Sequence, residues 1–178
     1  MTAPTRSAAP RSRLTRPQRK ALLVAHIALS VAWLGTALVM LTLAITARTT
    51  ASRTNANSAY WAMHLLVQVL VTPLSLTILV IGISLAAGTS WGLLRYRWVV
   101  TKLSLTIVAV GLSVLALPAQ TGSALRASEP GGDLIAMHSA GTYLIIAASV
   151  SISLYLTLTT VSVFKPWGRT ARGSRPAA

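Results

Sequence analysis

The stretch ALLVAHIALSVAWLGTALVMLTLAITA, residues 21–47, decides the fold class. It contains no Asp, Glu, Lys or Arg, and it is longer than the roughly 20 residues that a helix needs to cross a bilayer. A signal peptide has a shorter apolar stretch, of about 7–15 residues, that ends at a small-residue cleavage site. We therefore predict an uncleaved membrane-spanning helix over residues 21–47.

Three further apolar stretches follow, and the sequence predicts helices over residues 59–87, 98–117 and 134–164. Backbone groups in hydrocarbon must bond within the protein, and the alternating segments of a membrane β-barrel are absent. We predict an all-α fold, an up-down bundle of four transmembrane helices over residues 20–165. Residues 1–19 form a predicted disordered basic tail, and residues 166–178 form a second basic tail.

The connectors are predicted from helix-ending residues. Asn57 and Ser58 are good N-caps for the second helix, Gly88 ends it, and Pro118 opens a connector that runs to Asp133. Pro73 lies inside the second helix and predicts a kink there, because proline cannot donate its backbone hydrogen bond.

The composition fits a membrane protein, with 53% hydrophobic and only 10% charged residues. The net charge of +14 would suggest nucleic-acid binding in a soluble domain, but here the basic residues flank apolar spans. We interpret them as a topology signal and as contacts for anionic lipid headgroups, and we exclude nucleic acid as a partner. The excess of Arg over Lys is typical of bacteria with GC-rich genomes, so we expect a bacterial inner membrane.

The basic residues also predict the orientation. Thirteen Lys and Arg belong to the two tails and to the middle connector taken with Lys102, against three in the other two connectors. Because Lys and Arg concentrate in cytoplasmic segments, we expect both termini and the middle connector in the cytoplasm.

Each predicted helix has one face of small and polar residues that carries a single ionisable group, and we expect these faces to form the bundle interior. The faces are His26, Ser30, Trp33 and Ala37; His64, Gln68, Val71, Ser75 and Gly82; Lys102, Thr106, Ala109 and Ser113; and His138, Thr142, Ile145 and Ser149, continued by Ser153, Thr157 and Thr160.

Polar groups inside spanning helices are costly and are candidates for function. The candidate cofactor-binding residues are His64, His138, His26 and Lys102. In an up-down bundle the second and fourth helices are diagonal, so His64 and His138 would face each other and could hold haem b. His26 and Lys102 would form a second cluster. The alternative is structural, with hydrogen-bonded histidines and a lysine that reaches the headgroups.

Other chemistry has weaker support. The triplet Ala62-Met63-His64 recurs at Ala136-Met137-His138, which suggests two related helical hairpins. Nucleotide-binding and metalloprotease motifs are absent, and no residue is assigned a catalytic role. Whether the chain is an enzyme stays open. One alternative is an external metal site of His64, His138, Glu129 and Asp133.

Two stretches support a family resemblance: VAHIALSVAWLGTAL (24–38), with a His seven residues before a Trp, and WVVTKLSLTIV (98–108), with an in-membrane Lys. They resemble helices of a bacterial group that includes the HemJ-type protoporphyrinogen oxidases, the copper-resistance D membrane domains and uncharacterised four-helix families. The resemblance implies a haem or porphyrin site with roles for His26 and Lys102. The connectors and the other histidines depart from that pattern, so the oxidase activity is not carried over.

The sequence thus predicts a small membrane protein that packs against a membrane partner, or against its own copies, as an accessory subunit. The alternatives are a b-type haem or porphyrin-binding protein and a small channel or carrier.

Overall fold

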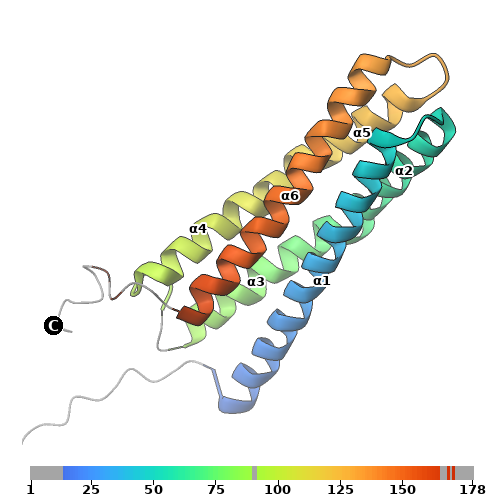
Figure 1. The fold of residues 1–178 in the computed structure, drawn as a ribbon. Helices are drawn as coiled ribbons and strands as arrows, with labels where there is room; N and C mark the ends of the chain where they lie inside the picture. The colour runs from blue at the N-terminus through green and yellow to red at the C-terminus, as the bar shows by residue number, and fades with distance from the viewer. Residues whose placement is uncertain (1–13, 90–91, 165–167, 169, 171–178) are drawn as a thin grey trace, which may run out of the picture.

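Four long antiparallel helical rods make up the fold, which we describe from a computed structural model (Figure 1). The structure describes residues 14–89, 92–164, 168 and 170, so most of both predicted tails lies outside the described residues. The rods are α1 (Arg16–Thr49); α2 (Arg53–Leu66), η1 (Val67–Val71) and α3 (Thr72–Gly88); α4 (Arg97–Gly111), η2 (Leu112–Ala116) and α5 (Leu117–Ser128); and α6 (Leu134–Phe164). The predicted all-α four-helix bundle is confirmed.

The packing order is that of a sequential up-down bundle. The first rod contacts the second and the fourth, and the third rod contacts the same two, so the first and third are diagonal, as are the second and fourth. One end of the bundle carries Arg16, Gly88, Arg97 and Phe164, and we call it the tail end. The other, with Thr49, Arg53, Ser128 and Leu134, is the far end. The first described helix begins and the last one ends at the tail end (Figure 1).

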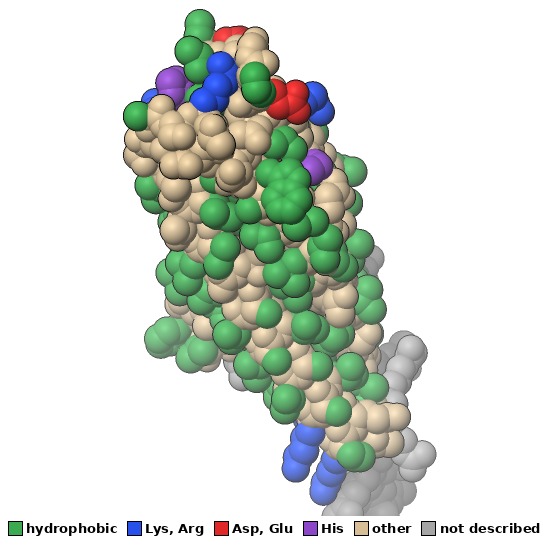
Figure 2. All heavy atoms as spheres, turned by 90° about the vertical axis from the view of Figure 1, so that its right-hand side faces the viewer, with side chains coloured by type: hydrophobic (Ala, Val, Ile, Leu, Met, Phe, Trp, Pro, Cys, Tyr) green, Lys and Arg blue, Asp and Glu red, His purple; other side chains and the backbone are tan. Residues whose placement is uncertain are grey.

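The outer surface of the rods is apolar. All four are long and apolar enough to cross a membrane, and at most 22% of the most apolar window of any rod is buried inside the protein. Figure 2 shows hydrophobic side chains along the flank of the bundle, with the charged side chains gathered toward its two ends. Apolar surface that is left exposed along a whole bundle requires lipid around it. The chain is therefore a multi-pass membrane protein.

Three helix boundaries differ from the prediction. The first rod begins at Arg16 because Thr15 and Gln18 form a capping box. The second begins at Arg53 because the Ser52 side chain caps it, so Asn57 and Ser58 lie within the helix. The third continues to Ser128, where a connector was expected from residue 118 onward.

Proline interrupts two rods without ending them. Pro73 and Pro118 each follow a π-helical turn, η1 and η2, in which the backbone N–H of Thr72 reaches the Val67 carbonyl and that of Leu117 reaches the Leu112 carbonyl. The wider turn redistributes the backbone bonds that a proline leaves unmade, as membrane helices tolerate. This arrangement explains why the third rod runs on past Pro118.

An arginine closes the far end. The Arg53 guanidinium donates to the carbonyls of Ala127 (3.0 Å), Ser128 (3.2 Å) and Gly132, at and just after the end of α5. These last carbonyls of a helix have no partner within it, so the guanidinium satisfies them and ties α2 to α5. The Asp133 carboxylate accepts from the Ile135 N–H at 2.8 Å and so caps the start of α6.

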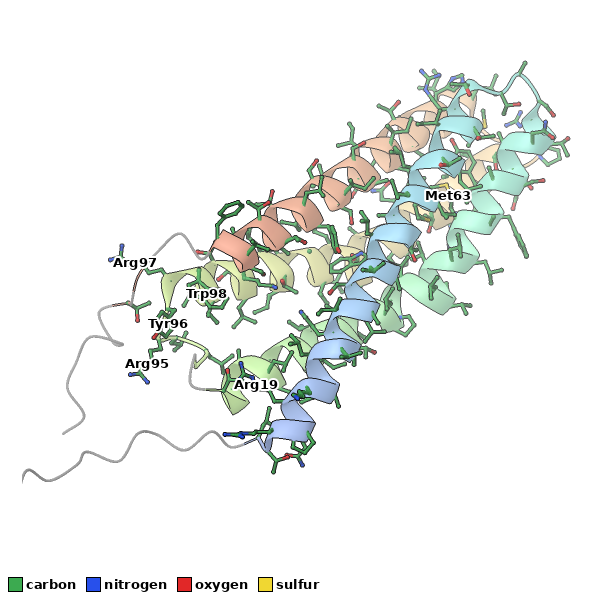
Figure 3. All side chains as sticks on the ribbon, turned by 60° about the horizontal axis from the view of Figure 1, so that its bottom comes forward. Arg19, Met63, Arg95, Tyr96, Arg97 and Trp98 are labelled. Atoms are coloured by element: carbon green, nitrogen blue, oxygen red, sulfur yellow. The ribbon has the colours of Figure 1, made fainter. Side chains whose placement is uncertain are left out.

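The far half of the bundle is tightly packed, whereas the tail-end half is not. One cluster of buried side chains fills the far half; it includes Met40, Ala44, Tyr60, Met63, Val67, Leu144 and Ala148. Alanines and Gly141 bring α1 and α6 close there, since small residues let membrane helices approach. Figure 3 shows Met63 among the packed helices and Arg19, Arg95 and Trp98 at the opposite end.

The predicted faces of small and polar residues point into the bundle along the first and third rods only. In α6 the predicted face of His138, Thr142, Ser149, Ser153, Thr157 and Thr160 points outward, and the buried residues include Met137, Ala140, Gly141 and Leu144. Thr142, Ser153, Thr157 and Thr160 donate to the carbonyl four residues earlier, so lipid exposure leaves none of these hydroxyls without an acceptor.

The second rod departs from the predicted face at Gln68, within its π-helical turn. Gln68 is exposed, while Val67, Val71 and Ser75 are buried. The extra residue in the turn rotates the later part of the rod relative to the earlier part, so one spacing rule cannot hold along its whole length.

Candidate functional site

Three adjoining cavities extend from the loosely packed tail end to the edge of the buried cluster, where Met40, Leu144 and Ala148 line the innermost one. The one at the tail end has a volume of about 260 Å³ and is lined by residues of α1, α3, α4 and α6, with Arg19 and Trp98 at its outer rim. A narrower cavity of about 60 Å³ lies deeper and shares His26, Ile78, Lys102 and Thr106 with it. A third, of about 230 Å³, shares Trp33, Ala37, Ser151 and Leu154 with the narrow one and reaches Leu117.

Lys102 is the only lysine in the described part of the spanning helices away from their ends, and it reaches across the bundle. Its ammonium donates to the Ser162 hydroxyl at 2.7 Å, and that hydroxyl donates to the Leu158 carbonyl at 2.8 Å. Both acids of the chain, Glu129 and Asp133, lie at the far end. The 26 residues from Lys102 to Ser128 correspond to about 39 Å of helix, so neither Glu129 nor Asp133 neutralises Lys102.

His26 lies beside Lys102 and has an unused ring nitrogen. Its Nδ1 atom is buried and has no hydrogen-bond partner within the described residues. The ring sits against α3 at Gly82, where an added Cβ would lie 3.3 Å from the His26 Cε1 atom. A glycine at this position therefore lets α3 approach the imidazole.

Two of the predicted site residues are thus brought together. His26 and Lys102 come from diagonal rods and line the same two cavities, as the sequence predicted for a second polar cluster. Both can donate hydrogen bonds, and Lys102 can carry a positive charge. Their cavities are otherwise lined mainly by apolar side chains. Chemically, this arrangement suits a negatively charged group that is attached to an apolar body.

The other two predicted residues do not meet. His138 is exposed on the outward face of α6, so the expectation that it faces His64 across the core is wrong. His64 pairs instead with the neighbouring rod, where its Nδ1 atom lies 3.0 Å from the Thr121 hydroxyl. The same hydroxyl lies 3.0 Å from the Leu117 carbonyl, and the imidazole tautomer decides which group donates in the contact with His64.

Tyr60, and not a pair of histidines, makes the polar contact between the second rod and the diagonal α6. Its ring is almost completely buried, and its hydroxyl donates to the Met137 carbonyl of the diagonal rod at 3.2 Å. The adjacent Trp61 is exposed. Gly141 makes room for the phenol, since an added Cβ there would lie 2.6 Å from its oxygen.

The alternative external metal site is not formed. Among the residues that the structure describes, which include His64, His138, Glu129 and Asp133, no three His, Cys, Asp or Glu side chains are placed to hold a metal ion.

We call the group of Lys102, His26, Ser162 and Arg19 the tail-end site. The sequence analysis did not identify Ser162 and Arg19 as members of this site. Ser162 lies 60 residues after Lys102, and only the rotation of α6 brings it into the bundle. Arg19 was counted as part of a tail, because the helix was expected to begin after it. The capping box of Thr15 and Gln18 was the signal that would have extended the helix to include Arg19.

Comparison with known proteins finds no matching family model, no matching curated protein and no matching solved structure.

Proposed function

We propose that this chain is a protein of a bacterial inner membrane that binds an anionic amphiphile at the tail-end site. The observation that carries the proposal is the placement of Lys102 and His26 in shared, mostly apolar cavities far from both acidic residues of the chain. A cation enclosed in a membrane protein is costly unless an anion accompanies it. An acidic headgroup supplies that anion, and its apolar part suits the cavity walls.

The proposed orientation agrees with such a ligand. If both termini are cytoplasmic, as the distribution of basic residues indicates, the site opens at the level of the cytoplasmic leaflet, which carries anionic lipids. Arg19 at the rim adds a positive charge where a headgroup would arrive.

The role is one of binding rather than catalysis. His26 and Lys102 can both donate, but neither acidic residue of the chain lies near them to complete an acid–base pair. A ligand-binding subunit that assembles with a membrane partner, or with its own copies, combines this site with the accessory role expected from the sequence. The outward hydroxyl face of α6 is the surface we would examine first for that assembly.

Native mass spectrometry of the detergent-purified full chain tests the proposal. The probes are phosphatidylglycerol and phosphatidylcholine with the same acyl chains, which differ in headgroup charge. We expect the wild type to retain the anionic lipid preferentially. Lys102→Met should weaken this binding about tenfold or more, because a charge-assisted hydrogen bond contributes about 1.5–3 kcal/mol.

The matched control is Lys20→Met, which removes a positive charge at the same end but from an exposed side chain that lines none of the three cavities. It should bind like the wild type. Equal binding of the two lipids, or equal losses in the two variants, would overturn the proposal, since either result assigns the effect to general surface charge.

Haem binding is a second candidate, favoured by the unpartnered Nδ1 of His26 beside Lys102. The described residues do not fit a bis-histidine haem, because His138 is outward and His64 is bonded to Thr121. An absorption spectrum after addition of haemin decides: a Soret band that is lost in His26→Ala would support haem, and a featureless spectrum would remove it.

A channel or carrier role receives less support from the geometry. The packed cluster of the far half, with Tyr60 and Met63 at its centre, lies between the three cavities and the far end. A flux assay in liposomes that detects no ion movement would exclude the channel or carrier role.

A further inference from the structure

The three cavities suggest which anionic amphiphile the site accepts, an inference that rests on the proposed function. We infer that the ligand has a single long alkyl chain, with its acidic head at Lys102 and His26 and its chain in the groove between the third rod and α6.

The three cavities follow one another along the bundle, each shares lining residues with the next, and we infer that they form one path. The path begins at the Arg19 rim, passes His26 and Lys102, and continues along Trp33 into the cavity of about 230 Å³ that ends at Leu117. The 15 residues from Lys102 to Leu117 correspond to about 22 Å of helix, which is most of the roughly 30 Å hydrocarbon core. This length suits a long chain and not a small anion.

The polar groups are concentrated at one end of the path. His26 and Lys102 line the two cavities near the tail end, whereas the innermost cavity is lined mainly by apolar side chains such as Met40, Leu112 and Leu144. A ligand that matches this distribution is charged at one end only. Its head would pair with the lysine, and its chain would follow the apolar wall.

The middle cavity is the smallest of the three, and we take its size to limit the ligand to one chain. The cavity there has a volume of about 60 Å³, about a quarter of either neighbour, and Trp33 and Tyr155 contribute to its walls. The next cavity opens toward lipid, because its lining residues Leu112, Ile146 and Val150 are each more than half exposed. A chain can therefore enter the groove sideways from the bilayer, and on our inference the small middle cavity has room for only one chain beside the head.

Alkyl phosphates test the inference, because head and chain can be varied separately. The probes are inorganic phosphate, octyl phosphate, hexadecyl phosphate and dihexadecyl phosphate, with hexadecanoate as the carboxylate counterpart. Binding to the full chain in detergent is measured by native mass spectrometry. Ala147→Phe is designed to obstruct the groove, and Ala119→Phe is its control, since Ala119 is exposed and lines none of the three cavities.

We expect hexadecyl phosphate to bind best and dihexadecyl phosphate to bind less well. Ala147→Phe should weaken hexadecyl phosphate about fivefold or more, because overpacking costs about 1–3 kcal/mol. It should leave octyl phosphate unchanged, since a short chain stops before the groove. For each probe, the binding of the variant is divided by the binding of the wild type. Because the same fraction of the probe enters the micelles in both experiments, this ratio does not depend on that partition. Similar binding of hexadecanoate would show that a carboxylate head suffices.

The outcomes separate the two proposals. Octyl phosphate and hexadecyl phosphate could both bind Lys102→Met more weakly while neither binds Ala147→Phe more weakly. In that case the anion site stands and the single-chain path is wrong. If dihexadecyl phosphate binds as tightly as hexadecyl phosphate, the small middle cavity does not select, and the inference is again wrong. If inorganic phosphate binds as well as the amphiphiles, the site recognises a free anion. If no probe binds, the proposed function itself fails.

Discussion

The Lys102 ammonium and the Ser162 hydroxyl lie 2.7 Å apart, although 60 residues separate them in the chain. The contact joins α4 to α6 near the tail end, where few other side chains are packed between these helices. It gives the lysine a neutral acceptor and leaves its other two N–H groups available to a ligand.

Removing the Ser162 hydroxyl should therefore destabilise the protein only while the lysine is present. We expect Ser162→Ala to lower the free energy of unfolding by about 1–3 kcal/mol, because the ammonium loses an acceptor in an enclosed site. The same change in a Lys102→Met background should cost much less. Unfolding in mixed detergent micelles measures this double-mutant cycle, and an additive result would contradict the contact.

The contact between His26 and Gly82 makes a second prediction. Alanine normally stabilises a helix relative to glycine by about 1 kcal/mol, and Gly111→Ala should show this gain because its Cβ would have no neighbour within 4 Å. Gly82→Ala should show no gain, since its Cβ would press on the imidazole. The gain should return at Gly82 in a His26→Ala background. Equal gains at Gly82 and Gly111 in the native background would argue against the contact.

Tyr60 and Gly141 make the third prediction, at the far end. Gly141→Ala should destabilise the bundle by about 1–3 kcal/mol, because the new methyl group would meet the buried phenol oxygen. Tyr60→Phe should cost about 1 kcal/mol for the lost hydrogen bond to the Met137 carbonyl. The double variant should be close to Tyr60→Phe alone. Thermal unfolding of the four proteins measures this coupling.

The predicted orientation can be tested directly, because the chain contains no cysteine. Ala51 and Gly168 are exposed, at the far end and the tail end respectively, so each can be replaced by a single cysteine. On intact cells, a membrane-impermeant maleimide should label Ala51→Cys, and it should label Gly168→Cys only after permeabilisation. The reverse pattern would place both termini outside and move the site to the outer leaflet.

The sequence by itself determined the four membrane helices and the up-down order. Long apolar stretches must be helical in lipid, and short connectors between them force neighbouring helices to be antiparallel. The same reasoning placed His26 and Lys102 near one end of the bundle. Their approach follows from helix length and direction, both of which are local properties of the chain.

Only the tertiary structure decided which face of each helix points inward. Serine and threonine can satisfy their hydroxyls on their own helix, so the hydroxyl face of α6 could turn to lipid while Ala140 and Gly141 packed against the bundle. The π-helical turn before Pro73 rotated the second rod in a way that residue spacing does not show. Rotations of this kind placed Ser162 beside Lys102, turned His138 away from His64, and left the tail-end cavities open.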